Sequence, residues 1–154
     1  MKDDPPCIVV TMGGADPAGL TSIACRTLLD GHAAERTTVV VGALNRTRDR
    51  LHAKFGERFD VMDQQDRDFD RTLRTATVTI INGGLTRYEC VAAATPFVAI
   101  SLNAYQARFT EKVVARGFGR HVELVDSWVG ARLRADVGWL LESYDDGPPW
   151  RKGL

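Results

Sequence analysis

The stretch Thr79-Ile80-Ile81-Asn82-Gly83-Gly84-Leu85-Thr86-Arg87-Tyr88-Glu89 decides how this sequence folds. It begins as an apolar run of strand length, breaks at two glycines and continues with residues that favour a helix from Thr86. The first amides of a helix lack partners within the helix, and the positive end of the helix dipole lies beside them. Because glycines carry no side chain, Gly83 and Gly84 would let a phosphate group approach these amides closely.

Thr86 and Glu89 are three residues apart and therefore share one face of the predicted helix. In one interpretation, the Thr86 hydroxyl joins the amides in binding phosphate, and the Glu89 carboxylate binds the ribose of a nucleotide. In the other, the two residues form a capping box, in which the threonine caps an amide and the glutamate reaches back. Taken alone, the stretch favours neither interpretation.

The rest of the chain alternates between segments typical of strands and segments typical of helices. We expect strands at residues 7–12, 38–42, 59–62, 78–82, 96–100 and 121–125. We expect helices from Asp16-Pro17 to Gly31, within 45–58, within 63–75, from 86, over 104–116 and over 128–141. Several of the strands are apolar on both faces, which is typical of a parallel sheet covered by helices on both sides. The sequence thus predicts an α/β protein with one doubly wound, Rossmann-like parallel sheet of about six strands.

The composition indicates one soluble domain. The 154 residues are 44% hydrophobic and 26% charged, and their formal net charge is zero, which argues against nucleic acid or a membrane surface as partner. No apolar run is long enough to span a bilayer. The three cysteines lack metal-binding or redox spacing, so we expect buried thiols in a reducing cytoplasm. We expect residues 1–6 to be a leader, 7–144 the domain, and 145–154 a C-terminal tail.

Two loops of this fold are expected to face one crevice, although they lie far apart in sequence. In the doubly wound order 3-2-1-4-5-6, the first and fourth strands are neighbours, and ligands bind beyond their carboxyl ends. The loops there are Met12-Gly-Gly-Ala-Asp16 and Asn82-Gly-Gly-Leu-Thr86. This context favours the ligand interpretation of Thr86 and Glu89. Neither loop has the dinucleotide fingerprint or a Walker motif, so binding of NAD and hydrolysis of ATP are disfavoured.

Four motifs carry a resemblance to a known family: Thr11-Met-Gly-Gly-Ala-Asp-Pro17, Asn82–Glu89, Ala92-Ala-Ala-Thr-Pro96 and Gln106. In order and spacing they resemble the C-terminal, donor-binding half of GT-B glycosyltransferases. Family 28 enzymes, such as the N-acetylglucosaminyltransferase that makes lipid II, are the most similar. The nucleotide-sugar hydrolase of pseudaminic acid synthesis and SpsG-like proteins resemble the chain too. The resemblance extends over residues 7–125.

The resemblance implies a UDP-sugar site and a role for each matching residue. Diphosphate binding is implied for Gly13, Gly14, Gly83, Gly84, Leu85, Thr86 and Arg87, ribose binding for Glu89, and sugar binding for Gln106 and Asn103. Arg87 could neutralise phosphate or contact a partner, and a solvated side chain is the default interpretation. Ala104-Tyr105 separates Asn103 from Gln106, whereas the family has the two residues adjacent, so a helix cap is the alternative for Asn103. No metal and no cofactor are implied.

The family places its acceptor site, and usually its catalytic base, in an N-terminal half that this sequence lacks. No catalytic residue is identified, because His32, His52 and His121 each stand where histidines are usually structural. The resemblance therefore implies a hexosyltransferase-type half that is inactive alone and works with an N-terminal-half partner protein. One alternative is a self-sufficient transferase or nucleotide-sugar hydrolase that acts as a homo-oligomer. Another is a degenerate half kept for protein interaction, against which both glycine loops and Glu89 argue.

Overall fold

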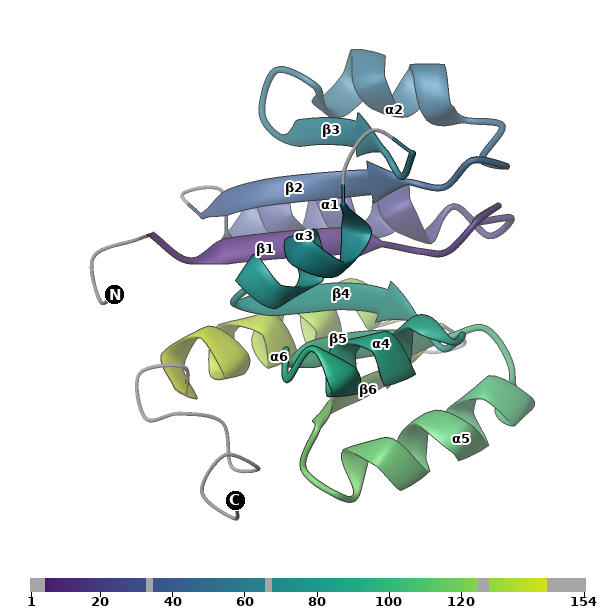
Figure 1. Ribbon diagram of the computed structural model, residues 1–154, viewed down its shortest axis with the longest axis vertical. Coiled ribbons are helices and arrows are strands. Elements are labelled where there is room, and N and C mark those ends of the chain that lie inside the picture. The colour runs from purple at the N-terminus through teal and green to yellow at the C-terminus, as the bar shows by residue number, and fades with distance from the viewer. Residues whose placement is uncertain (1–4, 33–34, 66–67, 125–127, 144–154) are drawn as a thin grey trace.

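A computed structural model of the protein describes residues 5–32, 35–65, 68–124 and 128–143, and most of the expected leader and all of the expected tail lie outside these ranges. Six strands and six helices alternate along the described chain (Figure 1). The strands are β1 (Cys7–Thr11), β2 (Arg36–Val41), β3 (Asp60–Asp63), β4 (Val78–Asn82), β5 (Phe97–Ser101) and β6 (Gly119–Glu123). The helices are α1 (Leu20–Gly31), α2 (Arg48–Phe55), α3 (Phe69–Thr75), α4 (Thr86–Ala92), α5 (Ala104–Val114) and α6 (Val129–Ser143).

All six strands run parallel in the order β3-β2-β1-β4-β5-β6, which confirms the predicted doubly wound sheet. β1 lies at the centre, where Val10 pairs with Val39 of β2 on one side and with Ile80 of β4 on the other. The chain reverses its direction of winding between β1 and β4. The two glycine loops therefore leave the sheet from neighbouring strands.

The helices cover both faces of the sheet (Figure 1). Side chains alternate along each strand, so neighbouring residues enter different cores. Ile80 packs in the larger core with residues of α1, α2 and α6, such as Leu28 and Leu133. Ile81 packs in a smaller core on the opposite face with residues of α3 and α4, such as Leu73 and Cys90. Within the described ranges, no helix is long and apolar enough to cross a membrane.

The first helix begins later than the sequence predicts. α1 starts at Leu20, not at Pro17, because Gly19 immediately before it has a left-handed backbone with φ of 68°. Asp16 still caps the helix, since its carboxylate accepts hydrogen bonds from the amides of Leu20 at 2.8 Å and Thr21 at 2.9 Å. Several strand boundaries also differ by one or two residues; β6, for example, begins at Gly119 because that residue pairs with Phe97 of β5.

Candidate functional site

Asn82, the last residue of β4, joins the two glycine loops. Its side-chain nitrogen donates a hydrogen bond to the carbonyl oxygen of Met12 at 2.8 Å, and its side-chain oxygen accepts one from the amide of Gly84 at 3.1 Å. Gly13 has a φ of 74°, and a Cβ atom on it would lie 3.2 Å from the side-chain nitrogen Nδ2 of Asn82. The two glycine loops are thus in contact, but Gly13 and Gly14 do not line the cavity described below, so the expected shared crevice is not confirmed.

The first glycine loop also packs against the end of β2. The amide of Leu44 donates a hydrogen bond to the carbonyl oxygen of Gly14 at 2.9 Å. A Cβ atom at Gly42 would overlap the carbonyl oxygen of Gly13, so only glycine fits there. Sequence reasoning did not assign Gly42 a role, because the close approach involves a loop about thirty residues earlier.

A cavity of about 380 Å³ lies between the second glycine loop and the first turns of α5. Its lining residues are Gly83, Gly84, Leu85, Arg87, Tyr88, Asn103, Tyr105, Gln106 and Phe109. Six of these carry a predicted role. The remaining predicted residues, Gly13, Gly14, Thr86 and Glu89, are not among the lining residues.

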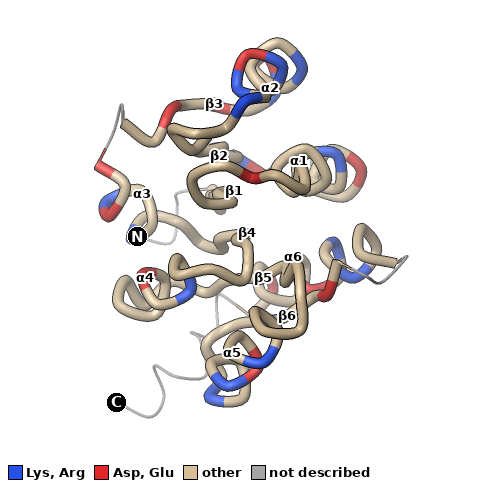
Figure 2. Tube along the Cα trace, turned by 90° about the vertical axis from the view of Figure 1, so that its right-hand side faces the viewer, with Lys and Arg blue, Asp and Glu red and all other residues tan. Residues whose placement is uncertain are grey.

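Figure 2, which looks onto the carboxyl ends of the strands, shows that most charged residues lie on the surrounding helices.

Arg87 is buried, with 6% of its surface exposed, so the interpretation as a solvated side chain is wrong. Its guanidinium donates hydrogen bonds to the carbonyl oxygens of Gly83 and Gly84. The guanidinium carbon also lies 4.6 Å from the ring centre of Tyr88 and 5.9 Å from that of Phe109. Arg87 forms no ion pair with a carboxylate of the described residues, and its Nε atom is buried without a hydrogen-bond partner. A buried positive charge without an anionic partner among the described residues therefore lines the cavity.

The capping box predicted for Thr86 and Glu89 is not formed. Leu85 occupies the N-cap position with helical backbone angles, and Thr86 is already the first helical residue. Thr86 is buried, whereas Glu89 is exposed. Neither side chain makes a hydrogen bond or ion pair with a residue of the described ranges. The structural interpretation of this pair is thus wrong, and both groups are free of competing side-chain bonds within the described chain.

Asn103 and Gln106 shape the opposite wall of the cavity. The Asn103 side chain accepts a hydrogen bond from the Gln106 amide at 2.9 Å, which confirms the helix cap as its role in the fold. The side-chain oxygen of Gln106 accepts a hydrogen bond from the Leu102 amide at 2.9 Å. A Cβ atom at Gly83 would lie 2.8 Å from the Ser101 hydroxyl and 2.9 Å from the Gln106 Cβ atom. Glycine at position 83 therefore keeps this wall close to the loop.

No family model and no curated protein matches the sequence. Solved structures do match. Os79 from O. sativa, in complex with U2F and trichothecene, is 18% identical with a TM-score of 0.67, and the match covers 94% of this chain and 34% of that one. The glycosyltransferase SnogD from Streptomyces nogalater is 20% identical with a TM-score of 0.59, and the match covers 96% of this chain and 41% of that one. This chain has the fold of one half of a GT-B glycosyltransferase.

A structure with a bound nucleotide is among the matches. The glycosyltransferase SsfS6 from Streptomyces sp. SF2575, complexed with thymidine diphosphate, is 17% identical with a TM-score of 0.54. The match covers 92% of this chain and 39% of SsfS6. The chain thus spans between about a third and two fifths of the length of these proteins. At this level of identity the likeness concerns the fold.

Proposed function

We propose that this chain binds a nucleotide sugar, with UDP as the nucleotide, and forms the donor half of a glycosyltransferase-type site. The observation that carries the proposal is Arg87, a buried guanidinium without an ion-pair partner in the described chain, at the wall of a cavity of about 380 Å³. A buried charge is costly unless an opposite charge compensates it. A diphosphate in the cavity would supply that charge.

The glycine pair would complete the diphosphate site. Gly83 and Gly84 line the cavity and carry no side chains, so a ligand can reach their backbone. Arg87 holds the carbonyl oxygens of both glycines, which keeps these acceptors away from an anion. α4 has only seven residues, so we assign the main electrostatic role to the guanidinium rather than to the helix dipole. We assign diphosphate binding also to Leu85 and Thr86, and ribose binding to Glu89. The first glycine loop, with Gly13 and Gly14, would support the second loop through Asn82.

The other wall of the cavity offers groups for the sugar. Gln106 uses its side-chain oxygen within the fold, which leaves its amide N–H groups for hydroxyl or carbonyl oxygens of a ligand. Asn103 lines the same wall. The resemblance to family 28 enzymes supports a UDP-sugar as the ligand, and the free buried thiols agree with the cytoplasmic location that we propose.

The acceptor and the catalytic base would come from an N-terminal-half partner, either a separate polypeptide or a region outside this sequence. Three large side chains that line the cavity are exposed to solvent: Leu85 (77% exposed), Tyr105 (73%) and Tyr88 (46%). Large apolar side chains gathered at one exposed place are typical of an interaction surface. This supports a half-site that a second domain covers, and we expect the chain alone to be inactive.

Calorimetric titration of uridine, UMP, UDP and UDP-sugars into the purified chain tests the proposal. If the diphosphate is the main recognition element, UDP binds at least about tenfold more tightly than UMP or uridine, because each charge-assisted hydrogen bond contributes about 1.5–3 kcal/mol. CDP, which keeps both the ribose and the diphosphate, tests the preference for uracil in the same series. Absence of saturable binding by UDP and UDP-sugars, or equal affinity for uridine and UDP, would reject the proposed site.

A further inference from the structure

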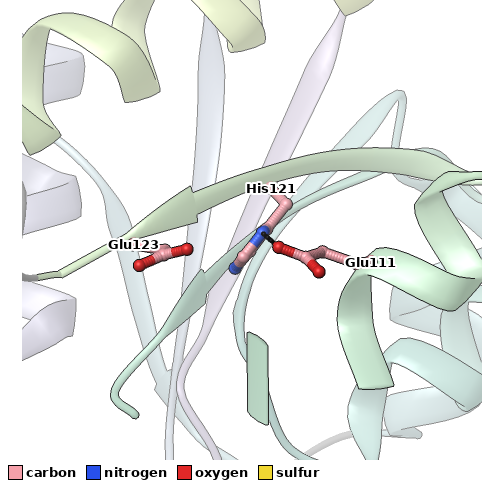
Figure 3. Close-up of side chains that lie close together, drawn as sticks. All are labelled: Glu111, His121 and Glu123. Carbon is pink, nitrogen blue, oxygen red and sulfur yellow. Dashed lines mark ion pairs between the residues drawn. The ribbon is translucent and has the colours of Figure 1, made fainter. Parts of the chain in front are cut away.

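A second cavity, of about 400 Å³, shares Asn103 with the first, and its acidic residues have no role in the proposed nucleotide-sugar site. Its wall includes Ser101 at the end of β5, Glu111 of α5 and Glu123 at the end of β6. His121, also on β6, lies between the two carboxylates (Figure 3). One ligand-type atom from each of Glu111, His121 and Glu123 lies within 4.8 Å of the other two.

The state of the His121 ring points to a ligand. Only 10% of the side chain is exposed, and its Nε2 atom lies at hydrogen-bond distance, 2.8 Å, from the Ser101 hydroxyl oxygen. Its Nδ1 atom makes no hydrogen bond with a residue of the described ranges, and the Glu111 carboxylate oxygen is 3.9 Å from it. The Ser101 contact thus leaves Nδ1 facing the Glu111 carboxylate, with which a protonated ring would form an ion pair (Figure 3). Metal-binding histidines are commonly oriented in this way through their other nitrogen.

We propose that Glu111, His121 and Glu123 bind one divalent transition-metal ion at the wall of this cavity, with zinc as the best match. One imidazole nitrogen and two carboxylate oxygens form a ligand set that zinc accepts. The two carboxylates match the charge of the ion. Three protein ligands leave a fourth coordination position open toward the cavity for water or another ligand.

The geometry needs only a small adjustment of the two glutamates. Zinc bonds of about 2.0–2.2 Å place neighbouring ligand atoms roughly 3.4 Å apart in a tetrahedral site. The present atoms lie within 4.8 Å of one another, so the site would close by somewhat more than one ångström. Glu111 and Glu123 are exposed and can change rotamer, while His121 stays fixed by Ser101.

Titration of zinc into the full chain, with a non-thiol reductant present, tests this site. The expected result is one zinc ion per chain, with the affinity reduced about tenfold or more in Glu111→Gln and in Glu123→Gln. These carboxylates are exposed, so we expect both variants to fold. The matched controls are Glu57→Gln, an exposed glutamate in the turn after α2, and His52→Asn, which removes the histidine that faces Asp63. Both controls should bind zinc like the wild type.

A spectroscopic measurement identifies the ligand atom. In nitrogen-15 NMR spectra of the histidine rings, zinc should shift the Nδ1 resonance of His121 and leave the rings of His32 and His52 unchanged. Unsaturable zinc binding, unchanged affinity in both glutamine variants, or a metal-induced shift confined to another histidine would overturn the proposal. Because these measurements use zinc without nucleotide, their failure would leave the proposed nucleotide-sugar site untouched.

Discussion

The guanidinium of Arg87 donates a hydrogen bond to the carbonyl oxygen of Gly84, 2.9 Å away. Through this contact the side chain of Arg87 points back toward the second glycine loop, which lies three to four residues earlier in the sequence. Arg87 therefore holds the backbone of the loop and brings a positive charge to the same cavity. The proposed binding of diphosphate depends on both effects.

Replacing Arg87 with methionine should separate binding from stability. We expect UDP affinity to fall at least about tenfold, because the charge at the cavity is lost. The free energy of unfolding should change by no more than about 2 kcal/mol, because methionine also removes the cost of burying an unpaired charge. Calorimetry and urea unfolding measure the two quantities. Arg74→Met, which removes an exposed arginine paired with Asp70, is the control and should leave UDP binding unchanged. Unaltered UDP affinity in Arg87→Met would contradict the role of the guanidinium.

Glu89→Gln tests the proposed contact with ribose. Glu89 is exposed and makes no hydrogen bond within the described chain, so its replacement should leave the free energy of unfolding nearly unchanged. Nucleotide binding should weaken, because a neutral amide accepts hydrogen bonds less strongly than a carboxylate. The difference should be largest for ribonucleotides and small for 2′,3′-dideoxynucleotides, which lack the ribose hydroxyls. Glu142→Gln on α6 is the matched control. Lost stability with intact binding would mean that Glu89 is structural.

The fold was predictable from the sequence because short, local sequence patterns indicate each strand and helix. Apolar runs bounded by glycine or charged residues indicated the six strands, and their alternation with helices indicated the parallel order. The start of α1 was predicted wrongly because Asp16-Pro17 looks like a helix start, whereas the positive φ of Gly19 delays the first turn. The capping box of Thr86 and Glu89 failed for a similar reason, since Leu85 already has helical angles.

The site was less predictable, because it depends on residues that are distant in sequence. The burial of Arg87 involves Phe109, which α5 contributes 22 residues later along the chain. The cavity opens toward α5 rather than toward the first glycine loop, because Asn82 and Gly42 pack that loop into the fold. The cluster of Glu111, His121 and Glu123 combines a helix and a strand, so no spacing motif marks it.

Asn82→Asp tests the connection between the loops. Aspartate keeps the acceptor for the Gly84 amide but replaces the donor to the Met12 carbonyl with a second, charged oxygen. We expect a loss of about 1–3 kcal/mol in the free energy of unfolding, measured with urea, because a part-buried carbonyl loses its partner and meets a like partial charge. Asn103→Ala, which removes a helix cap, should lose only about 1 kcal/mol. A smaller loss in Asn82→Asp than in Asn103→Ala would contradict a structural role for the connection.

Catalysis by the isolated chain should be negligible. In the proposed function, another half supplies the acceptor and the base, so a sugar bound to this chain alone would have no group placed to activate an attack on it. Incubation of the purified chain with UDP-N-acetylhexosamines should release no more UDP than buffer does. Robust release of UDP that disappears in Glu89→Ala would support the self-sufficient enzyme instead.

The most direct test of the proposed site is a titration of UDP into nitrogen-15-labelled chain, followed residue by residue in the backbone amide spectrum. We predict that the largest shifts occur at the amides of Gly83, Gly84 and Leu85, with saturation at one UDP per chain. The same titration of Arg87→Met should leave these amides nearly unshifted. Saturable shifts centred on another part of the chain, or no saturable shifts at all, would contradict diphosphate binding at the cavity beside Arg87.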